Sequence, residues 1–345
     1  MLDPRRKIRK HVTRDSADTL DRMDVVSDAI SAVQLGRPLA ERVRVGGSWR
    51  VRLDPYDGAG FGIVLKGACW LLTDSGVPAA LTAGDAALLP HGTGLVVAGS
   101  PLDAAAARTA TPYERWRRET DRRAWSGPDD TELLCGKYRL DSSRMHPLMT
   151  ELPEVVHLPR RVGGHPELRA AIDLLAGELD TTRSGSCIAL PSLIDLLLVY
   201  MLRSWMSEST CGTWPGALGD PVTAAALRAV HGDPAGRWTL DRLAAEAGVS
   251  RATLTRRFVS RVGRPPMAYL TWWRVTVAAT LLRDTRETLT AIAGRCGYGS
   301  PYALSHAFVR EFGVTPGRYR AQAVERTASA GGPGEGTPAV PRAGA

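Results

Sequence analysis

Short apolar runs alternate with turn residues along the segment from about residue 40 to residue 100. The runs include "RVRL", "FGIVL", "CWLL", "AALL" and "LVVA", and Asp-Pro, Asp-Gly, Ser-Gly and His-Gly pairs lie between them. Strands at such close spacing, joined by glycine turns, are typical of a β-sandwich or β-barrel. The stretch "TELLCGKYRL" at residues 131–140 predicts one further strand of the same unit.

The hydrophobic period changes after Pro166. In "HPELRAAIDLLAGELD" the apolar residues recur at the spacing of one helical face, which predicts a helix over residues 166–181. These positions are Leu168, Ile172, Leu175 and Leu179.

A second helix is predicted over residues 187–206, "CIALPSLIDLLLVYMLRSWM", with apolar residues nearly all round. Pro191, Asp195 and Arg203 interrupt this run, whereas a membrane-spanning helix needs about 20 predominantly apolar residues. We therefore expect a buried helix, covered by the β unit, by the other helix or by a second subunit. Because large exposed apolar patches usually mark interfaces, we predict a homodimer formed through the N-terminal half.

Near its C-terminus the chain carries one pattern twice. The copies begin at residue 243, "LAAEAGVSRATLTRRFVSRVGRPP", and at residue 292, "IAGRCGYGSPYALSHAFVREFGVTP". In each copy a glycine ends a first helix, and a serine caps the helix that follows a tight turn. This is the signature of two helix-turn-helix units, in which the second helix enters the major groove of DNA. The positions Ser250, Leu254, Phe258, Gly263 and Pro266 recur 50 residues later as Ser300, Leu304, Phe308, Gly313 and Pro316.

The outer face of each second helix supplies the candidate DNA contacts. We expect base contacts from Arg251, Ala252, Thr255 and Arg256 in the first copy, and from Pro301, Tyr302, Ser305 and His306 in the second. Candidate phosphate contacts are Ser250, Arg257, Arg261, Arg264 and Ser300. Arg256 and His306 occupy the same slot of the repeat, and an arginine there can form two hydrogen bonds to guanine. A phosphate contact or a solvated side chain is the alternative for Arg256.

The charge distribution agrees with a polyanionic partner. Residues 220–320 hold 15 arginines and seven acidic residues, so the excess in this region equals the net charge of +8 of the whole chain. A basic domain joined to a neutral carrier favours binding to nucleic acid. Between the two copies, "PPMAYLTWWRVTVAATLLRDT" predicts a connecting helix about 27 Å long. Such a helix can hold the two recognition helices near one turn of DNA apart, about 34 Å.

Residues 220–320 resemble the DNA-binding domain of the AraC/XylS family of bacterial transcription regulators. The resemblance is carried by "TLDRLAAEAGVSRATLTRRF", "AYLTWWRVTVAATLLRDT" and above all "IAGRCGYGSPYALSHAFVREFGVTPGRYR". It implies two helix-turn-helix subdomains on a long helix, with activation or repression of promoters. "FGIVLKGACWLL" and "LTAGDAALLPHGTGLVV" are similar to the cupin domain that precedes this DNA-binding domain in one branch of the family.

The cupin resemblance raises the possibility of a metalloenzyme. A cupin metal site generally takes three histidines and a carboxylate. Here Gly62 and the pair Gly94-Leu95 stand where histidines are common, and His91 is the one histidine of the cupin-like segment 61–97. We therefore expect no catalytic residues, no metal and no cofactor, and a barrel that acts as a sensor or assembly domain. A cupin-fold metalloenzyme with an accessory DNA-binding domain is the rival interpretation.

The cysteines offer a second alternative. Cys69, Cys135, Cys187, Cys211 and Cys296 are few, odd in number and widely spaced, which indicates reduced thiols in a cytoplasm. The basic N-terminus has no apolar run after it and does not look like a secretory signal. Cys69 and Cys135 fall on predicted strands, where they are either redox sensors or small buried hydrophobes.

The predicted fold is therefore an α+β, two-domain protein. A cupin-like β-barrel with following helices precedes an all-α domain with two helix-turn-helix motifs. The expected segments are a disordered tail (1–20), the barrel (21–160), a helical pair (161–208), a linker (209–219), the DNA-binding domain (220–324) and a second disordered tail (325–345). The predicted function is sequence-specific binding to double-stranded promoter DNA under control of a small-molecule effector, with RNA polymerase as a further possible partner.

Overall fold

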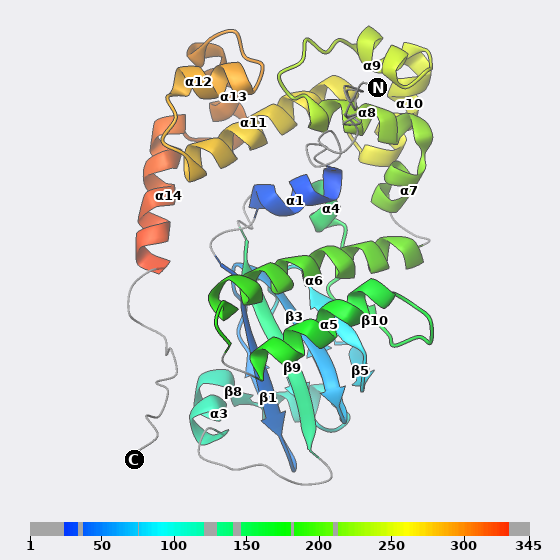
Figure 1. Ribbon diagram of the computed structural model, residues 1–345, viewed down its shortest axis with the longest axis vertical. Coiled ribbons are helices and arrows are strands. Elements are labelled where there is room, and N and C mark those ends of the chain that lie inside the picture. Colours follow the sequence, from blue (N-terminus) through cyan, green and yellow to red (C-terminus); the bar gives the residue numbers. More distant parts are fainter. Residues whose placement is uncertain are drawn as a thin grey trace, which may run out of the picture.

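The computed structural model describes residues 24–33, 37–74, 76–120, 130–140, 146–180, 183–209 and 213–330. A β unit flanked by two long helices lies at one end of the long axis, and a helical unit lies at the other (Figure 1). The strands are β1 (Leu39–Val45), β2 (Arg50–Leu53), β3 (Gly58–Lys66), β4 (Ala68–Thr73), β5 (Pro78–Thr82), β6 (Ala86–Leu89), β7 (Leu95–Ala98), β8 (Thr111–Pro112), β9 (Thr131–Arg139) and β10 (Val156–Leu158).

The helices fall into two groups. Those of the first part of the chain are α1 (Val25–Val33), α2 (Ala104–Arg108), α3 (Tyr113–Thr120), α4 (Pro147–Thr150), α5 (Pro166–Leu179) and α6 (Ser186–Glu208). Those of the second part are α7 (Thr213–Gly219), α8 (Pro221–Gly232), α9 (Leu240–Glu246), α10 (Arg251–Val262), α11 (Pro266–Asp284), α12 (Leu289–Arg295), α13 (Pro301–Phe312) and α14 (Pro316–Ala330). The α+β class and the all-α C-terminal part are confirmed.

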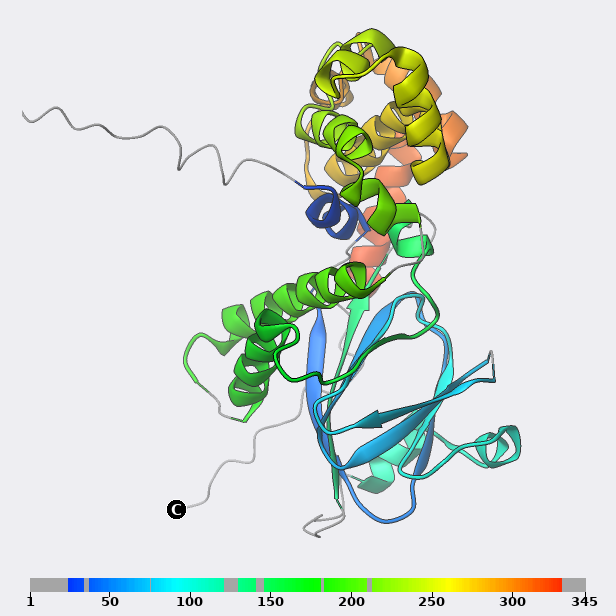
Figure 2. The same cartoon turned by 90° about the vertical axis from the view of Figure 1, so that its right-hand side faces the viewer.

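Two five-stranded sheets face each other in the β unit (Figure 2). Their strand orders are β1-β9-β3-β6-β10 and β5-β4-β7-β2-β8. Val51, Val64, Leu71 and Leu81 are among the apolar residues buried between them. The described strands form two separate hydrogen-bonded sheets, so the cupin-like unit is an open sandwich where the sequence predicted a barrel.

Helices α5 and α6 cover the outer side of the β1-β9-β3-β6-β10 sheet and agree closely with the two helices predicted from the sequence (Figure 2). On α6 the buried residues form one stripe, and the Tyr138 hydroxyl of β9 donates to the Ile194 carbonyl at 2.5 Å. The stripe consists of Ile194, Leu197, Leu198, Met201 and Leu202. By length and apolarity α6 could also cross a membrane, but here one of its faces packs against the sheet.

Three segments differ from the sequence prediction. Residues 213–219, assigned to a linker because of their Gly and Pro content, form α7, since the fully buried Trp214 anchors them. The predicted C-terminal tail begins inside α14, which continues to Ala330. Helix α1 was not predicted, although its apolar residues follow a helical pattern. The predicted tail at 1–20 and residues 331–345 lie outside the described residues.

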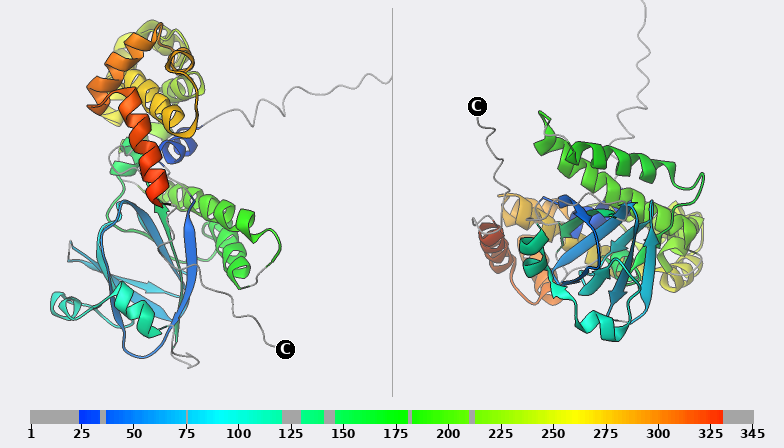
Figure 3. Two further views of the ribbon diagram at one scale, coloured as in Figure 1. Left: turned by 90° about the vertical axis from the view of Figure 1, so that its left-hand side faces the viewer. Right: turned by 90° about the horizontal axis from the view of Figure 1, so that it is seen from below.

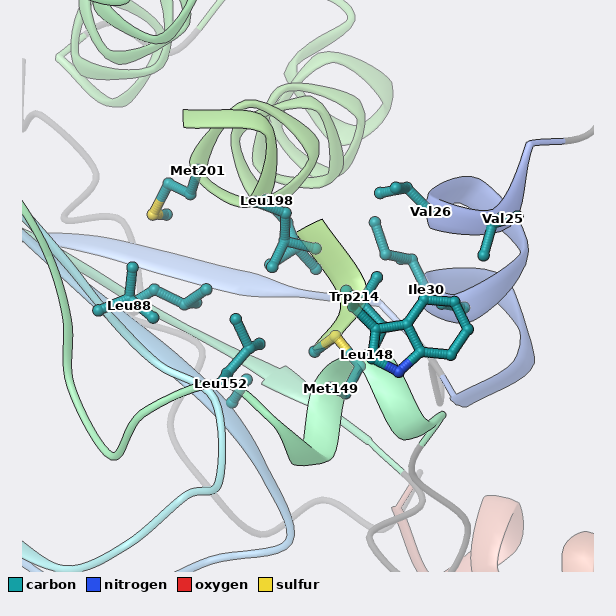
Figure 4. Packing of buried hydrophobic residues seen from close by; sticks show 14 of the residues in the cluster. Val25, Val26, Ile30, Leu88, Leu148, Met149, Leu152, Leu198, Met201 and Trp214 are labelled. Carbon is teal, nitrogen blue, oxygen red and sulfur yellow. The ribbon is translucent and has the colours of Figure 1, made fainter. Parts of the chain in front are cut away.

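The two ends of the molecule share one hydrophobic core. Figure 4 shows Val26 and Ile30 of α1 and Leu148 of α4 packed around Trp214. The same cluster of buried residues extends from the sheet to Leu254 and Phe258 of α10 and to Tyr269 and Trp273 of α11. The second unit has a separate core, formed by Val275, Ala278, Ala279, Leu282, Ile292, Ala293, Cys296, Leu304, Ala307, Phe308 and Tyr319.

His146, the N-cap of α4, lies at the centre of this shared core and is 1% exposed. Burial, together with the charges of His231 and Arg264, holds the pKa of its imidazole well below the ordinary value of 6.5. At a pH just below 6.5 the unfolded chain therefore binds a proton at this position that the folded chain does not bind. Burying the neutral His146 imidazole therefore lowers the stability of the folded protein only in acid. The free energy of unfolding is unaffected at neutral pH and decreases as the pH falls below about 6.5.

We predict that the melting temperature of the wild-type protein falls more between pH 7 and pH 5.5 than that of His146→Asn. The asparagine does not titrate, and its amide oxygen can still accept the backbone N–H that caps α4. Thermal unfolding of both proteins at several pH values measures the difference. Parallel pH profiles would show that His146 does not contribute to acid sensitivity.

Candidate nucleic-acid interface

The first helix-turn-helix unit consists of α9 and α10. The Thr239 side chain accepts from the backbone N–H of Arg242, and the Ser250 hydroxyl accepts from that of Thr253. At the end of α9, Gly248 adopts a φ of +66°, and the Val249 N–H reaches back to the Ala244 carbonyl at 2.9 Å. A residue in the left-handed region reverses the chain here, and glycine does so without steric cost.

The second unit, α12 and α13, is built by the same devices. Thr288 and Ser300 cap its two helices, Gly297 has a φ of +74°, and the Tyr298 N–H donates to the Ala293 carbonyl at 2.8 Å. The helices, caps and turns predicted from the repeat are thus confirmed in both copies. The second copy is one residue longer at this point, because Tyr298-Gly299 stands where the first copy has Val249.

Helix α10 turns Leu254, Phe258 and Val262 into the core and leaves its basic side in solvent. Arg251, Ala252 and Arg256 are exposed and Thr255 is half-buried. Together with Leu240 of α9, these four residues line a shallow hollow of about 430 Å³. The four base-contact candidates of the first copy therefore lie on one surface.

Asp241 of α9 is an unexpected neighbour of that surface, since its carboxylate lies 3.2 Å from Arg251. Both side chains are well exposed, and an ion pair in water is worth about 1 kcal/mol or less. Arg251 can therefore exchange this partner for DNA at little cost. The sequence pattern did not single out Asp241, which stands two residues after the capping residue Thr239, in the first turn of α9.

Helix α13 presents the corresponding surface of the second copy. Leu304, Ala307 and Phe308 are buried, whereas the Tyr302 side chain is 81% exposed and His306 is exposed. Pro301 and Ser305 are half-buried on the same outer side. An exposed tyrosine at the start of a recognition helix offers an aromatic ring and a hydroxyl to a groove.

The candidate phosphate contacts have partners within the protein. Arg257 forms an ion pair with Asp220 at 3.0 Å, Arg261 lies against Gly216 of α7, and Arg264 lies over the Trp272 ring at 5.6 Å. The hydroxyls of Ser250 and Ser300 serve as helix caps. A role in binding phosphate stays a prediction for these five residues, and each of them also has a contact within the protein.

Helix α11 connects the two units. Its 19 residues give a length of about 28 Å, close to the predicted 27 Å. Figure 1 shows it running beneath both units, so that α10 and α13 lie on the side away from the sandwich. Arg274 of α11 donates to the carbonyls of Pro234 and Gly236, both at 2.7 Å, and thereby fixes the loop before α9.

The cupin family matches residues 24–207 of this chain, and a helix-turn-helix domain family matches residues 243–322. An AraC-like transcription regulator from Streptomyces antibioticus is 34% identical over 301 residues, which are 86% of this chain and 98% of that protein. The chain belongs to the AraC-like transcription regulators.

Other similar proteins include the transcriptional regulator MtrA of Neisseria gonorrhoeae, 28% identical over 86% of this chain and 98% of MtrA. Among solved structures, the DNA-binding domain of AdpA in complex with a target DNA is 35% identical, with a TM-score of 0.30; the match covers 33% of this chain and 99% of that domain. The helix-turn-helix family match and the AraC-like relatives identify this protein as a DNA-binding transcriptional regulator.

In the cupin half of the regulator, His91, the histidine of the cupin-like segment 61–97, has a structural contact. The Nε2 atom of His91 lies 2.8 Å from the Leu152 carbonyl oxygen. Within the described ranges, no three His, Cys, Asp or Glu side chains gather as they would around a metal ion. Gly62 lies on β3 and Gly94 just before β7, as the strand pattern predicted.

The two cysteines considered for redox sensing lie on facing sheets of the regulator. Cys69 of β4 is buried and Cys135 of β9 is half-buried. Burial raises the pKa of each thiol to about 12, with the negative charges of Asp85 and Glu41, respectively, as the next contribution. The thiolate is the reactive form of cysteine, and a raised pKa leaves little of it near neutral pH. The surroundings of both thiols therefore favour a role as small buried hydrophobic residues.

We predict that Arg256→Ala lowers the regulator's preference at one base pair of its site by about 1–3 kcal/mol, since a bidentate contact to guanine would be lost. Selection from a randomised DNA pool gives the base profile of each protein. Arg118→Ala, on α3 in the cupin half, removes the same charge far from α10 and is the matched control. Identical profiles for wild type and Arg256→Ala would exclude the base contact.

Proposed function

We propose that this protein regulates transcription by reading two successive major grooves of promoter DNA with α10 and α13. The observation that carries the proposal is the repeated geometry of the two units, each of which exposes one polar helix face. The connector α11, about 28 Å long, matches a separation near one turn of DNA, about 34 Å. In this proposal Arg251, Arg256, Tyr302 and His306 contact base edges.

We infer that the cupin half has a sensing and assembly role and performs no catalysis. His91 is held by a backbone carbonyl, and Gly62 and Gly94 offer no ligand atoms. The continuous core between this half and the first helix-turn-helix unit gives a sensed signal a physical route to DNA. We further propose that the cupin half binds a small organic effector. In this proposal the regulator acts on RNA polymerase and is located in the cytoplasm.

The full-length regulator is expected to enrich a DNA site with two half-sites spaced about 10–10.5 base pairs apart. Its affinity for that site falls steeply with salt, because phosphate contacts release counterions. The double variant Arg256→Ala/His306→Ala should keep salt-dependent binding to bulk DNA and lose the site preference. Failure of the wild-type protein to enrich any sequence would overturn the proposal.

We also propose that the regulator forms a homodimer through α5 and α6. Figure 3 shows these helices outside the sandwich, with no other described element over their outer side. Helix α6 carries an 18-residue apolar stretch, yet only 28% of that stretch is buried. Leu174, Ile188 and Leu196 are 60%, 77% and 38% exposed, respectively. A second copy of the same face would remove this apolar surface from water.

A mass of two chains is expected for the full-length protein by light scattering at micromolar concentration. Ile188→Asp/Leu196→Asp should give one chain, because burying two carboxylates in an apolar interface is unfavourable. Val77→Asp is the matched control, since Val77 is 73% exposed in the β4–β5 turn, away from these helices. A single-chain mass for the wild type would argue against this interface.

A further inference from the structure

Four buried polar side chains meet where the cupin half contacts the first helix-turn-helix unit. Asp28 of α1 and His146, which caps α4, come from the cupin half, while His231 of α8 and Tyr269 of α11 come from the DNA-binding half. All four are at most 4% exposed. Since buried polar groups are costly unless paired, the way in which they pair defines the docked arrangement of the two halves.

The pairs form one continuous chain of hydrogen bonds. His146 Nε2 lies 3.2 Å from the Tyr269 hydroxyl, and that hydroxyl lies 2.8 Å from His231 Nε2. His231 Nδ1 in turn lies 2.5 Å from Asp28 Oδ2. The chain thus crosses the junction twice, from α4 to α11 and from α8 to α1.

One backbone N–H determines which atom donates and which accepts in each hydrogen bond of this chain. The Leu148 N–H donates to His146 Nδ1 at 3.1 Å, so the neutral imidazole carries its proton on Nε2 and donates to Tyr269. The Tyr269 hydroxyl can then donate to His231 Nε2, and His231 Nδ1–H donates to the Asp28 carboxylate. These hydrogen bonds all run in one direction, from His146 to Asp28, and hydrogen bonds arranged in this way strengthen one another. The second carboxylate oxygen, Asp28 Oδ1, is buried and has no hydrogen-bond partner among the described residues.

Aromatic rings link this chain to the recognition helix. The Tyr269 ring contacts Phe258 edge-on, with 5.6 Å between the ring centroids. Phe258 lies on the inner face of α10, directly behind the surface that carries Thr255 and Arg256. On the other side, the His146 ring packs edge-on against Trp214 at 4.9 Å and Trp272 at 5.3 Å.

The two helix-turn-helix units differ in whether their cores are continuous with the cupin half. The core of the first unit is continuous with the cupin half through Trp214 and Leu148. The core of the second unit is a separate cluster between Val275 and Tyr319. A displacement of α1 or α4 would therefore break the hydrogen-bond chain at the first unit and leave the packing of the second intact.

We propose that Asp28, His146, His231 and Tyr269 form the coupling element through which the cupin half positions the first recognition helix. His146 and His231 hold the Tyr269 hydroxyl, and Asp28 orients His231. The Tyr269 ring in turn positions Phe258, and Phe258 positions α10. This inference rests on the proposed function, because positioning α10 matters only if α10 contacts DNA. The four residues are positioning residues, and none of them touches the DNA surface.

Hydrogen exchange of the full-length protein without DNA tests the coupling separately from DNA binding. Tyr269→Phe removes the central hydroxyl and keeps the ring, and Asp28→Asn weakens the chain from its far end. Both variants are expected to speed amide exchange about fivefold or more in α1 and α10, while exchange in α13 stays unchanged. Tyr298→Phe is the matched control, because its buried hydroxyl has no hydrogen-bond partner among the described residues.

Two results would overturn the proposal. Faster amide exchange in α1 with no change in α10 would show that the hydrogen-bond chain does not influence α10. Equal changes in α10 and α13 would show a general loss of stability. In DNA selection, Tyr269→Phe should flatten the base profile only in the half-site altered by Arg256→Ala. If the wild type selects a site and Tyr269→Phe gives the same base profile, the positioning role is refuted. If the wild type selects no site, the proposed function is refuted.

Discussion

The burial of Trp214 and its neighbours is the interaction on which the arrangement of this molecule depends. The indole side chain is fully buried among residues from α1, α4 and the DNA-binding half, so the two halves cannot separate without exposing it. Burying a large aromatic side chain contributes roughly 1.5–3 kcal/mol, and several aliphatic residues add to it. The position of the sandwich relative to the first helix-turn-helix unit follows from this shared core.

Polar groups give that junction its specificity. Apolar packing tolerates small shifts, whereas the contact between Asp28 and His231 requires defined distances inside a dry core. The two residues are 203 positions apart in the chain and both side chains are fully buried. A structure that placed α1 elsewhere would leave a buried carboxylate or imidazole without its partner, which is strongly unfavourable.

Local features of this protein could be predicted from its sequence, and distant pairings could not. The serine caps, the left-handed glycines and the inward Leu254 and Phe258 follow from chemistry within a few residues, and the structure confirms them. Helices α5 and α6 also follow from apolar periodicity. The helical state of residues 213–219 depends on the burial of Trp214 by segments far away in the sequence, so local Gly and Pro content was misleading there.

The same limit applies to the candidate site. Which residues of α10 and α13 face outward could be deduced from the spacing of the inner ones. The sequence did not indicate that Arg257 is paired with Asp220 or that Arg264 stacks on Trp272, because those partners lie outside the repeat. The roles of the exposed residues toward individual bases stay predictions.

The connector α11 runs from Pro266 to Asp284 with no glycine or proline after its first residue. It is therefore a stiff arm, and the span between the two recognition helices is set by the protein. In the proposed complex, where both recognition helices bind one duplex, any mismatch between that span and the helical pitch of B-form DNA must be taken up by bending or twisting the duplex. The deformation energy depends on the base steps between the half-sites and is lowest at flexible pyrimidine–purine steps. In that proposed complex, the rigidity of α11 makes the binding affinity depend also on base pairs that no side chain contacts.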